Sequence, residues 1–175
     1  MPLTLHAAFV PSCRQIFGGV RAMIDKAEAH AREHGIADSE LYEAKLAEDM
    51  WPLPWHVRSC WVQTKLALEL VPTGEFSPDF TDIPADWEAM RAMSDEAIAA
   101  LDAADVDALE AIADNEVYFV LGGKRLMHFT VSDFLLSFSQ PNFYFHATTF
   151  YDILRMKGLP LAKLDYLQAP RIIRS

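Results

Sequence analysis

The chain has 175 residues, of which 51% are hydrophobic, so it can build one domain with a sizeable core without disulfides or structural metal. Its 25 acidic and 15 basic residues give a formal net charge of −10, which repels nucleic acid and anionic membrane surfaces. We therefore expect a single domain over residues 1–175 that binds neither nucleic acid nor membrane. The acidic excess between Glu75 and Glu116 is expected to form a solvated face.

Two cysteines, Cys13 and Cys60, lie in apolar surroundings and lack the Cys-x-x-Cys spacing. This pattern is typical of reduced core thiols in a cytosolic protein. The chain does not open with a secretion signal, and no stretch approaches the roughly 18 apolar residues that span a bilayer. We expect a soluble, cytoplasmic protein with both thiols free.

The first helix is predicted from Leu5 to about residue 33, where apolar residues recur every three or four positions. Gly35 is expected to end it, and Pro11 predicts a bend because it removes one backbone donor. A further helical turn or two is expected within residues 39–47.

A central second helix is predicted to begin near Pro52, with Asp49 as its cap, and to carry two apolar stripes. Pro72 and Gly74 are expected to end this helix. The residues that follow, as far as Pro84, then form a loop.

The second half of the chain adds a third helix over residues 85–103 and a short helix over 106–112. Alternating apolar residues at 117–121 and 124–129 flank a Gly-Gly pair, which predicts a β-hairpin with a primed turn. The turn explains these glycines better than a phosphate-binding loop, because the longer glycine spacing and the following lysine and serine are missing.

The last long helix is expected to open at a capping box that starts at Thr130 and to end at Gly158, followed by a tail with apolar anchors. Four long helices with a crossover between the second and third favour an all-α four-helix bundle with a small β-hairpin before the last helix.

The most informative stretch is Pro141-Asn142-Phe143-Tyr144-Phe145-His146, which combines a kink, an amide and an imidazole within the last helix. Helical spacing places Asn142 and His146 on one face with Thr149 and Ile153, where a core is expected. A buried polar group without a partner costs about 1 to 3 kcal/mol. These polar side chains therefore either find structural partners or line a site.

The other histidines are also candidate metal ligands by residue type. The sequence His30-Ala31-Arg32-Glu33-His34 matches an inverted zinc-protease motif, but it falls in the last turn before Gly35, where cationic side chains face water. His6 and His128 are expected at the surface or in packing roles. His56 and Cys60 lie one turn apart on the second helix, and both residue types can bind metal.

Three blocks of the sequence are similar to one family. They are Asp49-Met50-Trp51-Pro52-Leu53, the Pro141–His146 block followed by Tyr151-Asp152-Ile153-Leu154-Arg155, and Asp165-Tyr166-Leu167. Together they resemble an uncharacterised bacterial branch, a domain of unknown function, of the DinB/YfiT-like superfamily. The resemblance implies a DinB-like four-helix bundle that is often dimeric.

Many members of that superfamily bind a divalent metal through three histidines, one on the second helix and two one turn apart on the last. By this resemblance His146 matches the final ligand position, whereas the position one turn earlier carries Asn142. On the second helix either His56 or Cys60 falls near the remaining position. A neutral amide is a weak substitute for imidazole on zinc or nickel, so the implied metal site is incomplete.

Three hypotheses follow from these residues. In the leading one, a pocket between the second and last helices binds a small molecule without a tight metal, with Asn142, His146, Thr149 and Trp55 as ligand-binding residues. In the second, zinc or nickel binds His56 and His146, completed by water or Cys60, in a transferase or hydrolase. In the third, these groups are bonded within the core of a structural homodimer.

Overall fold

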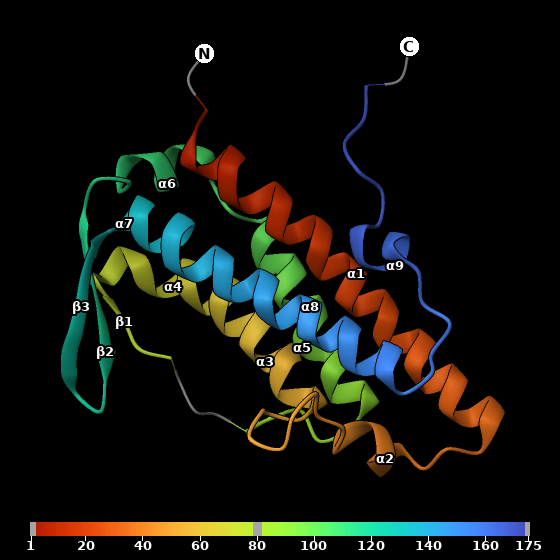
Figure 1. Cartoon of the computed structure of the whole chain (residues 1–175). Helices are drawn as coiled ribbons and strands as arrows, with labels where there is room; N and C mark the ends of the chain where they lie inside the picture. The colour runs from red at the N-terminus through yellow and green to blue at the C-terminus, as the bar shows by residue number, and fades with distance from the viewer. Residues whose placement is uncertain (1–2, 79–81, 174–175) are drawn as a thin grey trace.

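The computed structural model describes residues 3–78 and 82–173 of the chain. Within these residues, four long helical runs pack side by side, and α1 contacts α5 and α8 while α3 contacts the same two helices from the other side (Figure 1). The runs are α1 (Leu5–His34); α3 (Leu53–Trp61) with η1 (Val62–Leu66), α4 (Ala67–Leu70) and η2 (Val71–Thr73); α5 (Trp87–Asp102); and α7 (Val131–Asp133) with η3 (Phe134–Ser139) and α8 (Gln140–Met156).

The first run, α1, has the limits that its apolar period predicted. The Thr4 hydroxyl accepts from the backbone N–H of Ala7 at its start, and Gly35 ends it in the left-handed conformation with φ 65°. The helix continues through Pro11. No helix in the described part of the chain is both long and apolar enough to cross a membrane.

The second run begins one residue after Pro52, which occupies the N-cap position without a side-chain hydrogen bond. The prediction that Asp49 caps this helix was therefore wrong. Proline suits the helix start because its missing N–H would have no helical partner there. The run ends at Gly74, which adopts φ 79°.

Two segments of the bundle have π-helical hydrogen bonding, η1 in the second run and η3 in the last. One side-chain hydroxyl of each segment donates to a carbonyl of the helix before it: Thr64 Oγ1 to Cys60 O at 2.7 Å and Ser137 Oγ to Asp133 O at 2.6 Å. The buried Ser139 Oγ donates across to Gln63 O at 2.6 Å, so the two π segments contact each other. Pro141, which cannot donate a backbone hydrogen bond, is the second residue of α8, just after η3.

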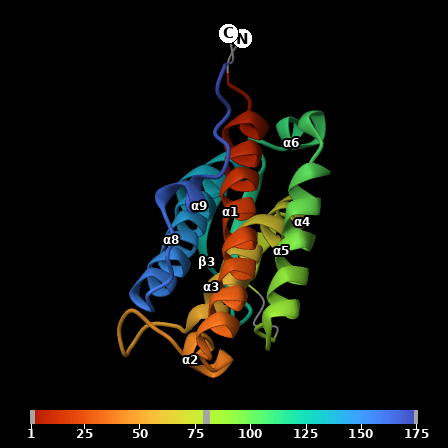
Figure 2. The same ribbon diagram turned by 90° about the vertical axis from the view of Figure 1, so that its right-hand side faces the viewer.

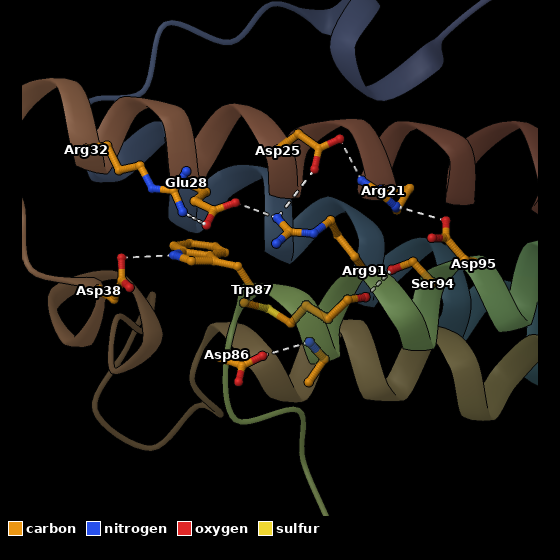
Figure 3. Close-up of polar contacts among 12 residues, drawn as sticks. Arg21, Asp25, Glu28, Arg32, Asp38, Asp86, Trp87, Arg91, Ser94 and Asp95 are labelled. Atoms are coloured by element: carbon orange, nitrogen blue, oxygen red, sulfur yellow. Dashed lines mark hydrogen bonds and ion pairs between the residues drawn. The ribbon is translucent and has the colours of Figure 1, made fainter.

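Opposite charges line the seam between α1 and α5, as Figure 3 shows. Three positions of α1 spaced seven residues apart pair with α5: Arg14 with Asp102, Arg21 with Asp95, and Glu28 with Arg91. Asp86 caps α5 through the N–H of Ala89. The exposed pairs each contribute little free energy, about 0 to 1 kcal/mol, but the order of their charges fits only the antiparallel arrangement.

The predicted hairpin is confirmed: β2 (Glu116–Leu121) pairs antiparallel with β3 (Lys124–Thr130), and both turn glycines have positive φ. The structure corrects the all-α classification at one point. A third strand, β1 (Glu75–Phe76), pairs parallel with β2 in a stretch that was predicted to be loop. The later part of that loop, residues 79–81, lies outside the described residues.

Three short helices complete the fold: α2 (Asp38–Tyr42), α6 (Val106–Ala111) and α9 (Lys163–Leu167). The last of them was not predicted as a helix. It lies against α1 (Figure 2), where Gln15 Nε2 donates to Leu167 O at 2.8 Å and Lys26 forms an ion pair with Asp165. A Cβ at Gly19 would stand only 2.9 Å from Asp165 O and closer still to Tyr166 O, so glycine permits this close approach.

Candidate functional site

A pocket of about 290 Å³ lies where the start of α3 and the segment before it meet α8. The contact between α3 and α8 is extensive, so the pocket is set on two rigid elements. Its lining combines polar and aromatic side chains: Asp49, Met50, Trp51, His56, Asn142, Phe145 and His146.

The centre of this pocket is a hydrogen bond between two imidazoles. His56 Nδ1 and His146 Nδ1 are 3.0 Å apart, and His56 Nε2 lies 3.1 Å from the carbonyl oxygen of Trp51. A carbonyl oxygen can only accept, so His56 carries its proton on Nε2 and its Nδ1 is an acceptor. His146 must then donate from Nδ1. Its Nε2 keeps a free lone pair, since the described residues offer it no hydrogen-bond partner.

Both imidazoles are held in the neutral form. Burial, together with the neighbouring His56, lowers the pKa of His146 from 6.5 to about 4. Burial also lowers the pKa of His56, while its bond to the Trp51 carbonyl acts in the opposite direction. The hydrogen-bond geometry itself requires a neutral His56, because its Nδ1 must accept from Nδ1 of His146.

Asn142 and His146 lie one helical turn apart, as predicted, and both line the pocket. Asn142 Nδ2 donates to Phe138 O at 2.7 Å, which fixes the amide and leaves its Oδ1 available. Thr149, which was expected to bind ligand, is buried and donates to Phe145 O at 2.8 Å within its own helix. It does not line the pocket.

The predicted ligand-binding residue Trp55 also lies outside the pocket lining. Its ring packs against Trp51 with centroids 4.8 Å apart, and the guanidinium of Arg58 lies over the Trp55 ring at 5.5 Å from its centroid. Trp51 is the indole that reaches the pocket, where its ring is nearly parallel to that of His146 at 6.0 Å.

Four lining residues were not assigned to the site from the sequence: Asp49, Met50, Trp51 and Phe145. Asp49 and Trp51 belong to a sequence block that carried the family resemblance, which was a signal for them. Phe145 was assigned to the apolar stripe of the last helix, yet 55% of its surface is exposed beside the pocket.

The two cysteines are free and buried, as predicted. Cys60 follows His56 by one turn but points to Phe143 O, at 3.8 Å from its sulfur, and does not line the pocket. Burial raises its pKa well above the usual thiol value, and burial raises that of Cys13 to about 12. Neither thiol is prepared to act as a thiolate.

The residues present do not fit the three-imidazole metal site that the superfamily resemblance implies. His56 and His146 are adjacent, but the third position is Asn142, whose nitrogen is bonded to the backbone. Across residues 3–78 and 82–173, no group of three or more His, Cys, Asp or Glu side chains is arranged to hold a metal ion.

The remaining motifs have structural roles or lie elsewhere. The rings of His30 and His34 pack at a tilt on the last turns of α1 with centroids 4.1 Å apart, and His34 Nδ1 bonds the His30 carbonyl. His6 contacts Ala104 O, and His128 stacks on Tyr118 across the hairpin. A larger cavity of about 500 Å³ lies between α1, the end of α5 and the C-terminal tail.

The fold is that of a mostly helical, DinB-like protein. A DinB family member protein from Shewanella denitrificans has a similar crystal structure, with a TM-score of 0.82 and 24% sequence identity over 98% of this chain and 96% of that one. At that identity the likeness establishes the fold alone. The chain belongs to the family described as Domain of unknown function (DUF1993), whose model matches residues 5–167. A search of the curated proteins found no match.

Proposed function

We propose that this protein binds a small molecule in the pocket between α3 and α8, and that Asn142 and His146 orient it by hydrogen bonds. One observation carries the proposal. The bond from His146 to His56, and that from His56 to the Trp51 carbonyl, leave His146 Nε2 as an unpaired acceptor on a residue that lines the pocket. Binding sites fix the orientation of a ligand with a small number of precisely placed polar groups.

Electrostatics favour binding over acid–base or nucleophilic catalysis at this site. A general base works best with a pKa near the operating pH, whereas the pKa of His146 is lowered to about 4. Such an imidazole accepts a hydrogen bond but holds a transferred proton poorly. Cys60, the nearest candidate nucleophile in sequence, is fully buried with a raised pKa.

The test is a ligand screen observed at the pocket. A library of small fragments of mixed charge is added to ¹⁵N-labelled protein, and the ring signals of Trp51 and His146 are followed by NMR. Fragments that bind should shift both signals in the wild-type protein and lose affinity at least about tenfold in His146→Asn. His128→Asn, which alters an exposed histidine on β3, is the matched control. A library that shifts neither signal contradicts the proposal.

A second candidate is weak binding of zinc or nickel by His56 and His146, as in a divergent metal-dependent enzyme. The contact between His56 Nε2 and the Trp51 carbonyl favours it, because metal-bound imidazoles commonly donate their other N–H to a backbone carbonyl. This candidate is the weaker of the two, since the described residues supply no third ligand.

We also propose that the protein is cytosolic. Two free, buried thiols match the reducing conditions of the cytosol, where we place the protein.

A further inference from the structure

We propose that the ligand of this pocket is an organic cation, a protonated amine carried on a small apolar group. This inference rests on the proposed function and adds the chemical class of the ligand. The ligand class follows from which hydrogen-bonding atoms around the pocket already have a partner and which have none.

Within the described residues, the free side-chain atoms of the lining are mainly acceptors, and the indole N–H of Trp51 is a free donor beside them. His56 has both ring nitrogens engaged, one with His146 and one with the Trp51 carbonyl. His146 offers only the lone pair of Nε2. Asn142 has its nitrogen on Phe138 O, which leaves Oδ1 as its unbonded heavy atom. Asp49 contributes a carboxylate, which can only accept.

No Lys or Arg is among the pocket's lining residues within the described chain, so the carboxylate of Asp49 has no cationic partner in the lining. A ligand with a carboxylate or phosphate would meet like charge there and find few donors. An ammonium group has three donors and a positive charge, which match one carboxylate and two neutral acceptors.

Two exposed aromatic rings complete the match. Trp51 is 48% exposed and Phe145 is 55% exposed, and both belong to the pocket lining. Aromatic faces attract organic cations by about 0.5 to 2 kcal/mol and also cover apolar ligand surface. The volume of about 290 Å³ lies at the lower end of ligand pockets, which fits one ring and a short aminoalkyl chain.

A metal ion also prefers acceptors, but it needs several of them within bonding distance at once. The described His, Cys, Asp and Glu side chains form no such group of three. An ammonium ion tolerates contacts that are longer and less regular than those of a metal ion, near 2.7 to 2.9 Å for each hydrogen bond that it donates. It therefore suits this more open arrangement.

The test compares three probes of nearly equal shape: 2-phenylethylamine, 2-phenylethanol and phenylacetate. Each is titrated into the full-length protein at neutral pH while the ring signals of Trp51 and His146 are followed by NMR. We expect the amine to shift both signals and to bind at least about tenfold more tightly than the alcohol, with phenylacetate weakest.

Two variants locate the charge. Asp49→Asn keeps the shape of the side chain and should weaken amine binding about fivefold or more while leaving the alcohol unchanged. Glu48→Gln removes the same charge from the neighbouring exposed residue, which does not line the pocket, and should leave both affinities unchanged.

The outcomes separate this inference from the proposed function. If the alcohol or phenylacetate binds at these signals as tightly as the amine, or if no probe binds, the ligand class is wrong. The fragment screen decides independently whether the pocket binds small molecules. Equal loss in Asp49→Asn and Glu48→Gln, or a response to Zn²⁺ alone, likewise overturns the amine assignment.

Discussion

His146 joins α8 to α3 through its hydrogen bond with His56, and measurements of the free energy of unfolding can test this contact. Replacing His146 by Ala leaves Nδ1 of His56 without its donor, at a residue that is only 1% exposed. We expect a loss of about 1 to 3 kcal/mol in the free energy of unfolding. Urea denaturation checks the value. His128→Ala, at an exposed position, should change it by less than about 0.5 kcal/mol.

The same imidazole predicts a pH dependence. In the unfolded chain His146 takes up a proton near pH 6.5, but in the folded protein its pKa is lowered to about 4. The unfolded state therefore binds more protons between these values, and stability falls as the pH is lowered from about 6.5 toward 4.

The size of this effect follows from the shift, at about 2 to 3 kcal/mol for His146, with His56 adding in the same direction. His146→Asn removes the titrating group and should flatten the dependence across this window. Urea denaturation at a series of pH values measures it. Equal slopes for the variant and the parent would mean that His146 is already protonated or exposed in the folded state.

Asn142→His tests whether the pocket still has the shape of a metal site. The new imidazole would lie one turn from His146 and close to His56, so it would supply the missing third nitrogen. We expect the affinity for zinc or nickel to rise at least about tenfold over the parent in calorimetry.

The measurement needs a background without the His30 and His34 pair. Their neighbouring rings on α1 can chelate metal at the surface, so both variant and parent should carry His30→Ala and His34→Ala. Unchanged affinity in this background would show that the geometry of the site, and not only one ligand, differs from that of the superfamily.

The sequence analysis named three of the seven residues that line this pocket. His56, Asn142 and His146 were found because helical spacing and family resemblance both report on residues within regular helices. Asp49 and Trp51 lie before α3, where no periodic pattern states which side chains turn inward. Thr149 was misplaced for a physical reason: a hydroxyl can bond its own helix, so a polar residue on an inner face need not face a ligand.

Substitutions at two neighbouring glycines of α1 distinguish the effect of helix propensity on stability from that of packing against α9. Gly19→Ala places a methyl group against the backbone carbonyls of Tyr166 and Asp165, so α9 must move. We expect a loss of about 1 to 3 kcal/mol in the free energy of unfolding, measured by urea denaturation.

Gly18→Ala is the matched control, since its new Cβ would meet only the end of the Arg14 side chain at 3.6 Å. Alanine favours the helix at this position, so stability should stay the same or rise by up to about 1 kcal/mol. If both variants behave alike, the contact between α9 and α1 is not needed for stability.

Long elements were predictable, and short ones were not. The limits of α1 and α5 and the hairpin turn follow from local patterns of apolar residues, caps and glycines. The two residues of β1 form a strand only because β2, some forty positions later, supplies its partners, and no local signal encodes such pairing. The five residues of α9 are likewise helical because they pack on α1.

At the scale of the whole molecule, the resemblance predicts a homodimer, and this stays a prediction. Apolar side chains of the hairpin, Leu121, Leu126 and Met127, are exposed and could contribute to an interface. Light scattering at micromolar concentrations should give twice the chain mass of 19.7 kDa. A mass equal to one chain would contradict the dimer and any function placed on its surface.

The two π segments have a consequence for the direction in which the pocket's side chains face. Each represents one residue more than an α-helix would need over the same stretch, and one residue turns a helix by about 100°. In the last run, η3 precedes Asn142 and His146, so it determines which way they face relative to the hairpin end. Asn142 and His146 share α8 with buried core residues such as Phe143 and Phe150, so a one-residue deletion in η3 that turned the polar pair would turn this core face with it. The direction of the pocket's side chains is therefore tied to the packing of the last helix, and the two cannot change separately.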